Sequence, residues 1–268
     1  MPIQRLITFT TDFGLTEHYV GVMKGVIHSV NPYANVVDIS NAVQSFDILD
    51  GALTISQAYS YFPKDTIHLV VVDPGVGSAR RPILVSAGAY QFVAPDNGVL
   101  SLVYEREERV SVRHITAEHY FRPPISNTFH GRDIFAPVAA YLSKGVDTAK
   151  FGDTITDYVR FAAPKPKPTA PNAWKGVVLK TDKFGNLITN ITPQALPQLF
   201  DGSSFKITVG KAMVTKLCTS YAAGEPGELF AVLGSTGFLE ISANRGAAAR
   251  LAGADKGSEV SVTLSGGA

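Results

Sequence analysis

The sequence of 268 residues has a single cysteine, Cys218, and few charged residues. One cysteine cannot close a disulfide within the chain, and no cluster of cysteine and histidine has the spacing of a zinc site. Charged residues make up 18% and apolar residues 45%, against ~25% charged in typical soluble domains, which argues against intrinsic disorder. The formal net charge is only +1, so the whole chain has no strong field to attract nucleic acid or an anionic membrane.

Long hydrophobic runs are also missing. No uninterrupted stretch approaches the roughly 18 apolar residues of a membrane helix, and residues 1–5 do not lead into the apolar core of a signal peptide. A chain of this length buries roughly three quarters of its unfolded surface, so folding requires neither disulfides nor a structural metal. We therefore expect a globular, cytoplasmic protein.

Strand-like and helix-like patterns alternate up to about residue 160. The nearly continuous apolar run at 67–72 is typical of a strand that is covered on both faces. This alternation predicts an N-terminal α/β domain with a largely parallel sheet. The apolar spacing predicts strands at 6–10, 36–39, 67–72, 82–86, 90–94 and 110–115, and helices at 20–30, 48–61 and 133–143.

The composition changes at residues 163–172, which contain four prolines and predict an extended linker. Shorter strand-like runs punctuated by glycine follow it. We therefore expect an α/β domain at 1–162 and a smaller, β-rich and barrel-like domain at 173–268. The predicted strands of the second domain are 176–180, 187–191, 205–209, 229–233, 238–241 and 259–264.

Two aspartates follow predicted strands of the first domain, Asp12 at 11–14 and Asp73 at 72–77. In open α/β sheets, ligands bind outside the carboxyl ends of the strands. A carboxylate there can accept hydrogen bonds from a ribose diol or orient a nucleophile. Each segment also fits a simple turn in which the aspartate binds the local backbone. Two such strand ends in one domain favour a ligand-binding site over two unrelated turns.

The loop that begins at Asp73 is rich in glycine and ends at Arg80 and Arg81. It resembles a nest of backbone amides for an anion, but it lacks the Lys-Ser/Thr ending of a P-loop, and a flexible turn explains it equally well. Asp73 and Arg80 lie seven residues apart and can converge on one small cavity. His130 is a further candidate, because a glycine and two charged residues follow it directly.

The second domain offers polar and aromatic residues after a predicted strand. Asp182 can bind an ammonium group, Phe184 can cover a flat ring, and Asn186 has the donor and acceptor that match a purine edge. A hairpin with aspartate and glycine-asparagine turn residues explains the same segment. Residues 234–237 offer amides and hydroxyls to a carboxylate, or form a tight turn.

Together these segments resemble the S-adenosylmethionine (SAM) hydroxide adenosyltransferase family, the SAM hydrolases, whose relatives include the SAM-dependent fluorinase and chlorinase. The resemblance extends from residue 7 to about residue 264. It depends on the order and spacing of five short motifs, at 11–14 (TDFG), 72–77 (VDPGVG), 94–98 (APDNG), 129–133 (FHGRD) and 182–186 (DKFGN).

The resemblance implies an enzyme that hydrolyses SAM to adenosine and methionine without a metal or cofactor. It also implies a homotrimer with active sites between subunits. Asp73, Arg80 and His130 match the family's catalytic set. The implied substrate contacts are Asp12 at the ribose hydroxyls, Phe46 beside the sugar, Asp182 at the methionine ammonium, Phe184 on the base, Asn186 at the adenine edge, Ser235 at the methionine carboxylate, and Glu240 and Asn244 in the C-terminal wall. Thr236 departs from the halogenase pattern, which has an arginine beside the serine.

Water is the expected nucleophile. A chloride ~4 Å from an ionised Asp73 would be repelled by about 4 kcal/mol at an effective dielectric constant of about 20. Gly131 also stands where the fluorinase supplies a serine hydroxyl. The alternatives are a SAM-dependent halogenase, a non-catalytic sensor of adenosine or SAM, and a metal- or phosphate-dependent nucleotide hydrolase that uses Asp12, Asp73, His130 and Asp133.

Overall fold

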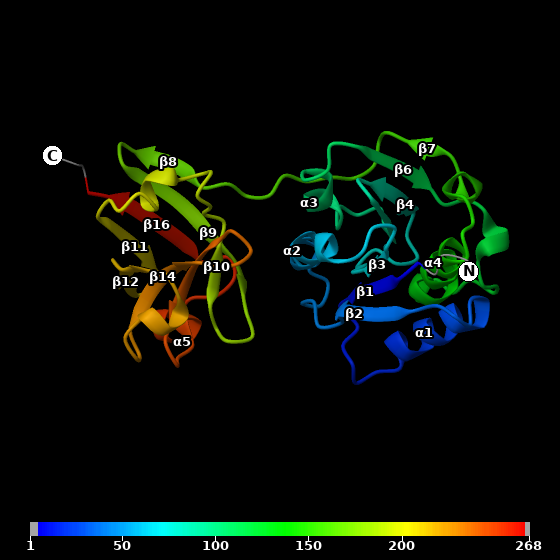
Figure 1. The fold of residues 1–268 in the computed structure, drawn as a ribbon, viewed down its shortest axis with the longest axis horizontal. Helices are drawn as coiled ribbons and strands as arrows, with labels where there is room; N and C mark the ends of the chain where they lie inside the picture. Colours follow the sequence, from blue (N-terminus) through cyan, green and yellow to red (C-terminus); the bar gives the residue numbers. More distant parts are fainter. Residues whose placement is uncertain (1–4, 266–268) are drawn as a thin grey trace. The chain divides into compact units, whose positions relative to one another are not determined.

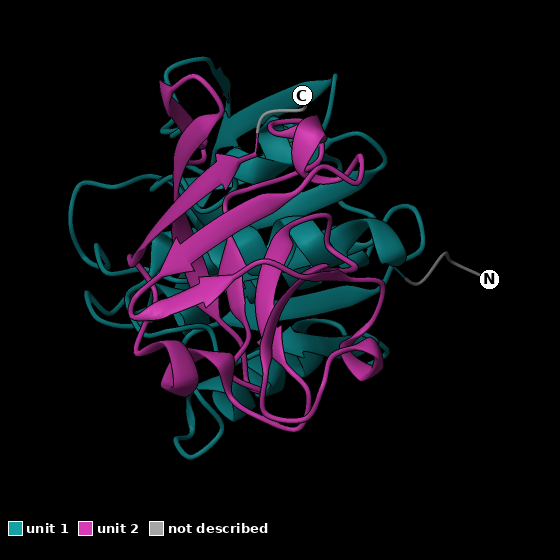
Figure 2. Ribbon diagram, turned by 90° about the vertical axis from the view of Figure 1, so that its left-hand side faces the viewer, with its two compact units in different colours: residues 1–162 teal, residues 163–268 magenta. Residues whose placement is uncertain are grey.

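The computed structural model describes residues 5–265, and the chain divides into two compact units, residues 1–162 and 163–268 (Figure 2). Unit 1 is an α/β fold, and unit 2 is built mainly from β-strands (Figure 1). The predicted fold class is therefore confirmed. Among the described residues, no helix has the length and apolar character needed to cross a membrane.

The sheet of unit 1 has seven strands in the order β2-β1-β3-β5-β4-β6-β7. β4 and β7 run against the other five strands, so the sheet is largely parallel. β1 and β3 are parallel neighbours in which Thr11 pairs with Val71, so the residues after them leave the sheet at one edge. The strands are β1 (Ile7–Thr11), β2 (Val36–Ser40), β3 (Ile67–Val71), β4 (Pro82–Ala87), β5 (Tyr90–Pro95), β6 (Val110–His114) and β7 (Thr154–Ile155).

Helices cover both faces of this sheet, α1 and α4 on one face and α2 and α3 on the other (Figure 1). Leu69 and Val71 of β3 pack into the core that contains α1 and α4, whereas Val70 packs into the other core. Both faces of β3 are buried, which explains its unbroken apolar sequence. The helices are α1 (Tyr19–Val30), α2 (Ile48–Ala58), α3 (Ser101–Tyr104) and α4 (Ala136–Ser143), with 3-10 turns at Tyr59–Tyr61, Glu118–Tyr120 and Thr148–Phe151.

Two predicted helices differ from the observed ones at their ends. The helix expected at 48–61 ends at Ala58 and continues as a 3-10 turn. The helix expected at 133–143 begins as a π-helical turn at Gly131–Phe135 before α4 starts. Such π turns are frequent at functional sites, and this one directly follows His130.

Unit 2 contains a curled sheet of nine strands in the order β12-β11-β16-β9-β10-β15-β14-β13, with β8 beside β9 (Figure 1). Its core consists of apolar side chains from these strands, such as Ile207, Ile241 and Val260. The elements are β8 (Lys167–Ala170), β9 (Ala173–Thr181), β10 (Leu187–Thr189), β11 (Phe205–Val209), β12 (Ala212–Val214), β13 (Leu217–Cys218), β14 (Leu229–Leu233), β15 (Leu239–Ala243), α5 (Ala248–Ala252) and β16 (Glu259–Leu264), with 3-10 turns at Pro197–Leu199 and Tyr221–Ala223.

The proline-rich segment at 163–172, expected as a linker, contains strand β8. This strand pairs antiparallel with β9, and Pro168 lies opposite Trp174. Proline lacks the backbone N–H of a central strand but is tolerated at a sheet edge, which is where β8 lies. Part of the expected linker is therefore an edge strand of unit 2.

Candidate active site

Asp73 and Arg80 form a two-pronged ion pair within the loop between β3 and β4. Arg80 Nε donates to Asp73 Oδ1 at 3.0 Å, and Arg80 Nη2 donates to Asp73 Oδ2 at 2.5 Å. The side chains of Arg80 and Asp73 are only 8% and 4% exposed, respectively. A bidentate, charge-assisted contact of this kind fixes both groups in one plane, and the shielding from water strengthens it.

His130 joins this pair from a loop that is 50 residues further along the chain. Arg80 Nη2 lies 2.7 Å from His130 Nδ1. A guanidinium group can only donate, so Nδ1 accepts and the proton of the neutral ring is on Nε2. Burial and the positive charge of Arg80 both lower the pKa of His130, which keeps the ring neutral at physiological pH.

Gly77 allows the loop that contains Asp73 and the loop that contains His130 to approach each other. Its φ is +78°, and a Cβ atom at this position would lie 2.2 Å from the carbonyl oxygen of Asn127. Asn127 belongs to the loop that leads into His130. A side chain on residue 77 would push the Asp73 loop away from the His130 loop, so glycine is required here for packing as well as for conformation.

A small cavity of about 40 Å³ lies beside this cluster. Asp73, Thr128 and His130 line it together with the rings of Phe13 and Phe129. The volume exceeds the ~10–15 Å³ that one water molecule requires, and the walls offer polar partners. The cavity therefore has the size and chemistry to hold a single water molecule between a carboxylate and an imidazole.

Asp12 follows β1 and is hydrogen-bonded to the residue predicted to lie beside the sugar. Phe46 N donates to Asp12 Oδ2 at 2.8 Å. Phe46 has a φ of +65°, which is unfavourable for a bulky residue, and its side chain is 74% exposed. Burial raises the pKa of Asp12, the amide of Phe46 opposes that rise, and the charge of Asp73 adds to it. The charge of Asp73 therefore acts on the carboxylate of Asp12.

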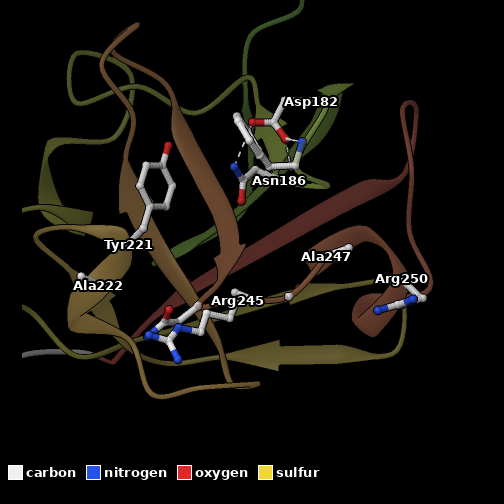
Figure 3. A pocket seen from close by; sticks show the side chains of 11 residues that line it. Asp182, Asn186, Tyr221, Ala222, Arg245, Ala247 and Arg250 are labelled. Atoms are coloured by element: carbon white, nitrogen blue, oxygen red, sulfur yellow. Dashed lines mark hydrogen bonds between the residues drawn. The ribbon is translucent and has the colours of Figure 1, made fainter.

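Unit 2 has a larger cavity of about 770 Å³, shown in Figure 3. Three of the predicted binding residues, Asp182, Phe184 and Asn186, line it from the hairpin between β9 and β10, and Asn244 lines it after β15. Phe184 is 76% exposed, so its ring is available to a ligand. An aromatic face beside amide and carboxylate groups suits a heteroaromatic ring with a polar edge.

The carboxylate of Asp182 organises the hairpin around Asn186 (Figure 3). Asp182 Oδ1 accepts from the backbone N–H groups of Phe184 and Asn186 at 2.9 and 2.8 Å, and Oδ2 accepts from Asn186 Nδ2 at 2.9 Å. A carboxylate has about four acceptor positions, so one stays free for a ligand. The contact with Asp182 uses one N–H of the Asn186 side-chain amide. It does not use the Oδ1 atom or the second N–H of that amide.

Ser235 and Glu240 are not among the residues that line this cavity. Ser235 is exposed after β14, whereas Glu240 is buried in β15. Glu240 accepts a hydrogen bond of 2.7 Å from the hydroxyl of Tyr221, which does line the cavity. Burial raises the pKa of Glu240, and burial together with this hydrogen bond raises the pKa of Tyr221 to about 12. Glu240 is therefore connected to the cavity through its hydrogen bond with Tyr221.

The residues that line this cavity include several that were not predicted from the sequence, among them Tyr221, Arg245, Ala247 and Arg250. Tyr221 lies in a 3-10 turn without a recognisable motif. Arg245 directly follows the predicted Asn244 in the sequence, and its backbone has a φ of +55°. Strained backbone at a non-glycine residue often marks a ligand site, but it is visible only in the structure.

The carboxylate of Asp133 is hydrogen-bonded to neighbouring protein groups and does not belong to a group of metal ligands within the described residues. It is fully buried, and its carboxylate accepts from Arg132 Nε and Nη2 at 2.7 and 2.8 Å and from Ser126 N at 2.9 Å. Across residues 5–265, no group of three or more His, Cys, Asp or Glu side chains could hold a metal ion. The metal-dependent nucleotide hydrolase therefore has no ligand set in this part of the chain.

Comparison with known proteins places both units in one family. The family models for the N-terminal and C-terminal domains of SAM hydroxide adenosyltransferase match residues 7–152 and 176–261. The (R)-S-adenosyl-L-methionine hydrolase of Salinispora tropica is 36% identical over 96% of this chain and 97% of the relative. A fluorinase from an Actinoplanes species is 26% identical over 89% and 91% of the two chains. The crystal structure of an uncharacterized conserved protein from Thermotoga maritima has a TM-score of 0.89 and 36% identity, and it covers 96% of this chain and 100% of its own.

The fold and the site define a two-unit protein with an Asp–Arg–His cluster at the carboxyl edge of an α/β sheet and a ligand-sized cavity in a β-rich unit. The matches to both domain models and the identity over nearly the full length show more. The chain belongs to the SAM hydroxide adenosyltransferase family.

Proposed function

We propose that this protein hydrolyses SAM to adenosine and L-methionine by attack of water on the ribose 5′ carbon. The observation on which the proposal depends is the hydrogen-bonded cluster of Asp73, Arg80 and His130 beside a cavity of about 40 Å³. The name of the Salinispora tropica relative, (R)-S-adenosyl-L-methionine hydrolase, supports the same reaction.

The chemistry requires little more than an oriented water molecule. The water oxygen forms a bond to the 5′ carbon while the bond from that carbon to sulfur breaks. The electron pair of the breaking bond returns to sulfur, so methionine leaves with a neutral thioether and needs no general acid. The protein still has to align the two reactants and remove one proton from the water. General base catalysis typically increases the reaction rate ~10²–10⁴-fold.

Asp73 is the group that can accept this proton. His130 Nδ1 is occupied by Arg80, and the remaining nitrogen carries a hydrogen, so the ring can donate to the water but not accept from it. Each carboxylate oxygen of Asp73 accepts one bond from Arg80 and retains a second lone pair. Arg80 stabilises the negative charge that develops on the attacking oxygen.

Halide is a less suitable nucleophile for this site. The ionised Asp73 repels an anion, and Gly131 leaves no hydroxyl where the fluorinase has a serine. A Cβ atom on Gly131 would lie 3.0 Å from Met23 Sδ and 3.2 Å from the Phe129 ring, so these side chains must move to admit a serine. The packing around Gly131 therefore supports water over halide.

The substrate contacts belong to the same proposal. Asp12 and Phe46 of unit 1 would hold the ribose, whereas Phe184 and Asn186 of unit 2 would hold the adenine. The free acceptor position of Asp182 would take the methionine ammonium. Ser235, Glu240 and Asn244 would complete the methionine side, with Glu240 acting through Tyr221.

We further propose a homotrimer in which unit 1 of one subunit meets unit 2 of the next. Unit 1 has 13 Lys or Arg and 16 Asp or Glu residues, a net charge of −3, and unit 2 has 11 and 7, a net charge of +4. Opposite charges on the two units favour a head-to-tail contact between copies. Independence from metals and cofactors and a cytoplasmic location remain predictions.

Incubation of the purified protein with SAM in H₂¹⁸O, followed by chromatography and mass spectrometry, tests the reaction. We expect adenosine with ¹⁸O at the 5′ hydroxyl, and an Asp73→Asn variant at least ~10²-fold slower. In concentrated chloride, 5′-chloro-5′-deoxyadenosine as the main product would show a halogenase. Tight SAM binding without any product would show a sensor.

A further inference from the structure

One motif of the sequence, residues 94–98, has no part in the proposed chemistry. Its central residues, Asp96 and Asn97, directly follow β5. In the sheet, β5 lies between β3 and β4, and the loop at 72–81 joins those two strands. The loop that contains Asp73 and Arg80 therefore spans the end of β5, with its two ends on either side of Asp96 and Asn97.

Asn97 holds the first end of the loop. Its Nδ2 donates to the carbonyl oxygen of Val72 at 2.9 Å, and its Oδ1 accepts from Val99 N at 3.1 Å. The Val72 carbonyl belongs to the peptide bond that leads into Asp73, and the Val72 side chain is fully buried. A fixed peptide plane at this point restricts the direction in which the Asp73 side chain leaves the backbone.

Asp96 holds the other end. Its Oδ2 accepts from Arg81 Nε and Nη2 at 2.9 and 2.7 Å, and its backbone N–H donates to the Arg81 carbonyl at 2.9 Å. The Asp96 side chain is only 2% exposed, and its Oδ1 accepts from Val159 N at 2.8 Å. Arg81 directly follows Arg80, so these bonds fix the backbone from which the Arg80 guanidinium reaches Asp73.

We propose that Asp96 and Asn97 are positioning residues that hold the Asp73–Arg80 pair in its reactive geometry. This inference rests on the proposed hydrolysis of SAM. Neither residue touches the 40 Å³ cavity, so each acts through the loop that it anchors. A displacement of about 1 Å in a reacting group can slow an enzyme about 10²-fold, which is the scale of effect expected when an anchor is lost.

Asn97→Asp is the sharpest variant because it keeps one hydrogen bond of the side chain and replaces the donor of the other with an oxygen that the Val72 carbonyl repels. The carboxylate that replaces the amide can still accept from Val99 N, but the donor to the Val72 carbonyl is gone. Asn31→Asp is the matched control. Asn31 Oδ1 accepts from Tyr33 N at 3.2 Å, also two residues ahead, and its Nδ2 donates to Ser143 Oγ at 2.9 Å. These bonds involve α4 and the end of α1, not the loop at 72–81.

The first measurement is the rate of adenosine formation with varied SAM. We expect Asn97→Asp to lower kcat about 10–100-fold with KM within about twofold of the parent, because the substrate contacts are untouched. Asn31→Asp should lose thermal stability without this loss in kcat. Equal kcat values for the two variants would overturn the proposal, since Asn97 would then serve only the fold.

The second measurement repeats Asn97→Asp in the Asp73→Asn background under single-turnover conditions. If Asn97 acts by positioning Asp73, it causes no further loss once the carboxylate is gone. Additive losses would show a role independent of Asp73 and overturn the inference. Full activity of Asp73→Asn alone would refute the role of Asp73 as the base. No adenosine from SAM with the parent protein would instead refute the proposed function, so the failures are distinguishable.

Asp96→Asn answers the same question if Asn97→Asp does not fold. It retains an acceptor for Val159 N and removes the charge that holds Arg81. Its control is Asp157→Asn, because Asp157 binds the same Arg81 at 2.8 Å from a side chain that is 76% exposed. A fall in kcat for Asp96→Asn alone supports the proposal, and equal kcat values for both variants contradict it.

Discussion

Acidification should destabilise unit 1 through His68, a fully buried residue of β3 that the proposed mechanism does not use. Thr8 Oγ1 lies 2.7 Å from His68 Nδ1, whereas His68 Nε2 has no hydrogen-bond partner in the part of the chain that the structure describes. The rings of Tyr59, Phe62 and Phe92 surround it. Burial among these rings lowers the pKa of His68 from 6.5 to about 3.

The size of the effect follows from the difference between the folded and unfolded pKa values. The unfolded chain takes up a proton at His68 near pH 6.5, but the folded chain does so only near pH 3. The stability contribution is therefore complete above pH 6.5 and is lost progressively as the pH falls toward 3. At about 1.36 kcal/mol for each pKa unit, the free energy of unfolding should fall by about 2 kcal/mol between pH 7 and pH 5.

Urea unfolding at both pH values measures this loss. Far-UV circular dichroism follows the helices, which lie mainly in unit 1, and fluorescence of Trp174, the single tryptophan, follows unit 2. The comparison protein is a Thr8→Val/His68→Phe double variant, which removes both hydrogen-bonding partners and the titrating group. Other groups titrate equally in both proteins, so the difference between them isolates His68.

The reasoning would be refuted if the double variant lost as much stability between pH 7 and pH 5 as the natural sequence does. It would also be refuted if only the Trp174 transition responded to His68, because that tryptophan belongs to unit 2.

Three further predictions concern the cluster itself. Gly77→Ala should lower the free energy of unfolding by about 1–2 kcal/mol through the left-handed backbone alone. It should also slow hydrolysis, because the new Cβ atom meets the Asn127 carbonyl. Thermal unfolding measures the first effect and kcat the second, and an unchanged kcat would contradict the role of this contact. Arg80→Lys should lower kcat about 10²–10³-fold, because an ammonium cannot hold Asp73 in two places and His130 at once. An NMR titration of His130 in Arg80→Met should show a higher pKa than in the natural sequence, and an unchanged value would exclude Arg80 as a cause.

Local sequence patterns predicted most of the fold because their causes are local. The apolar run at 67–72 marked a strand buried on both faces, and the turn-like segments at Asp12 and Asp73 marked the ends of strands. Short elements escaped prediction, since the two residues of β7 or β13 contain no periodic pattern. The edge strand β8 was hidden by the prolines within and around it, which favour an extended linker and an edge strand equally.

The sequence by itself determined which residues could perform the chemistry: Asp73 and Arg80 share one short loop, and His130 lies in a separate motif. Only the tertiary structure decided that Arg80 donates to both, which fixes the tautomer of His130 and leaves Asp73 to accept a proton. It also decided that Asn97 anchors the Val72 carbonyl. The reason is that such contacts depend on the order of strands in the sheet, which brings distant loops to one edge and has no signature in local sequence.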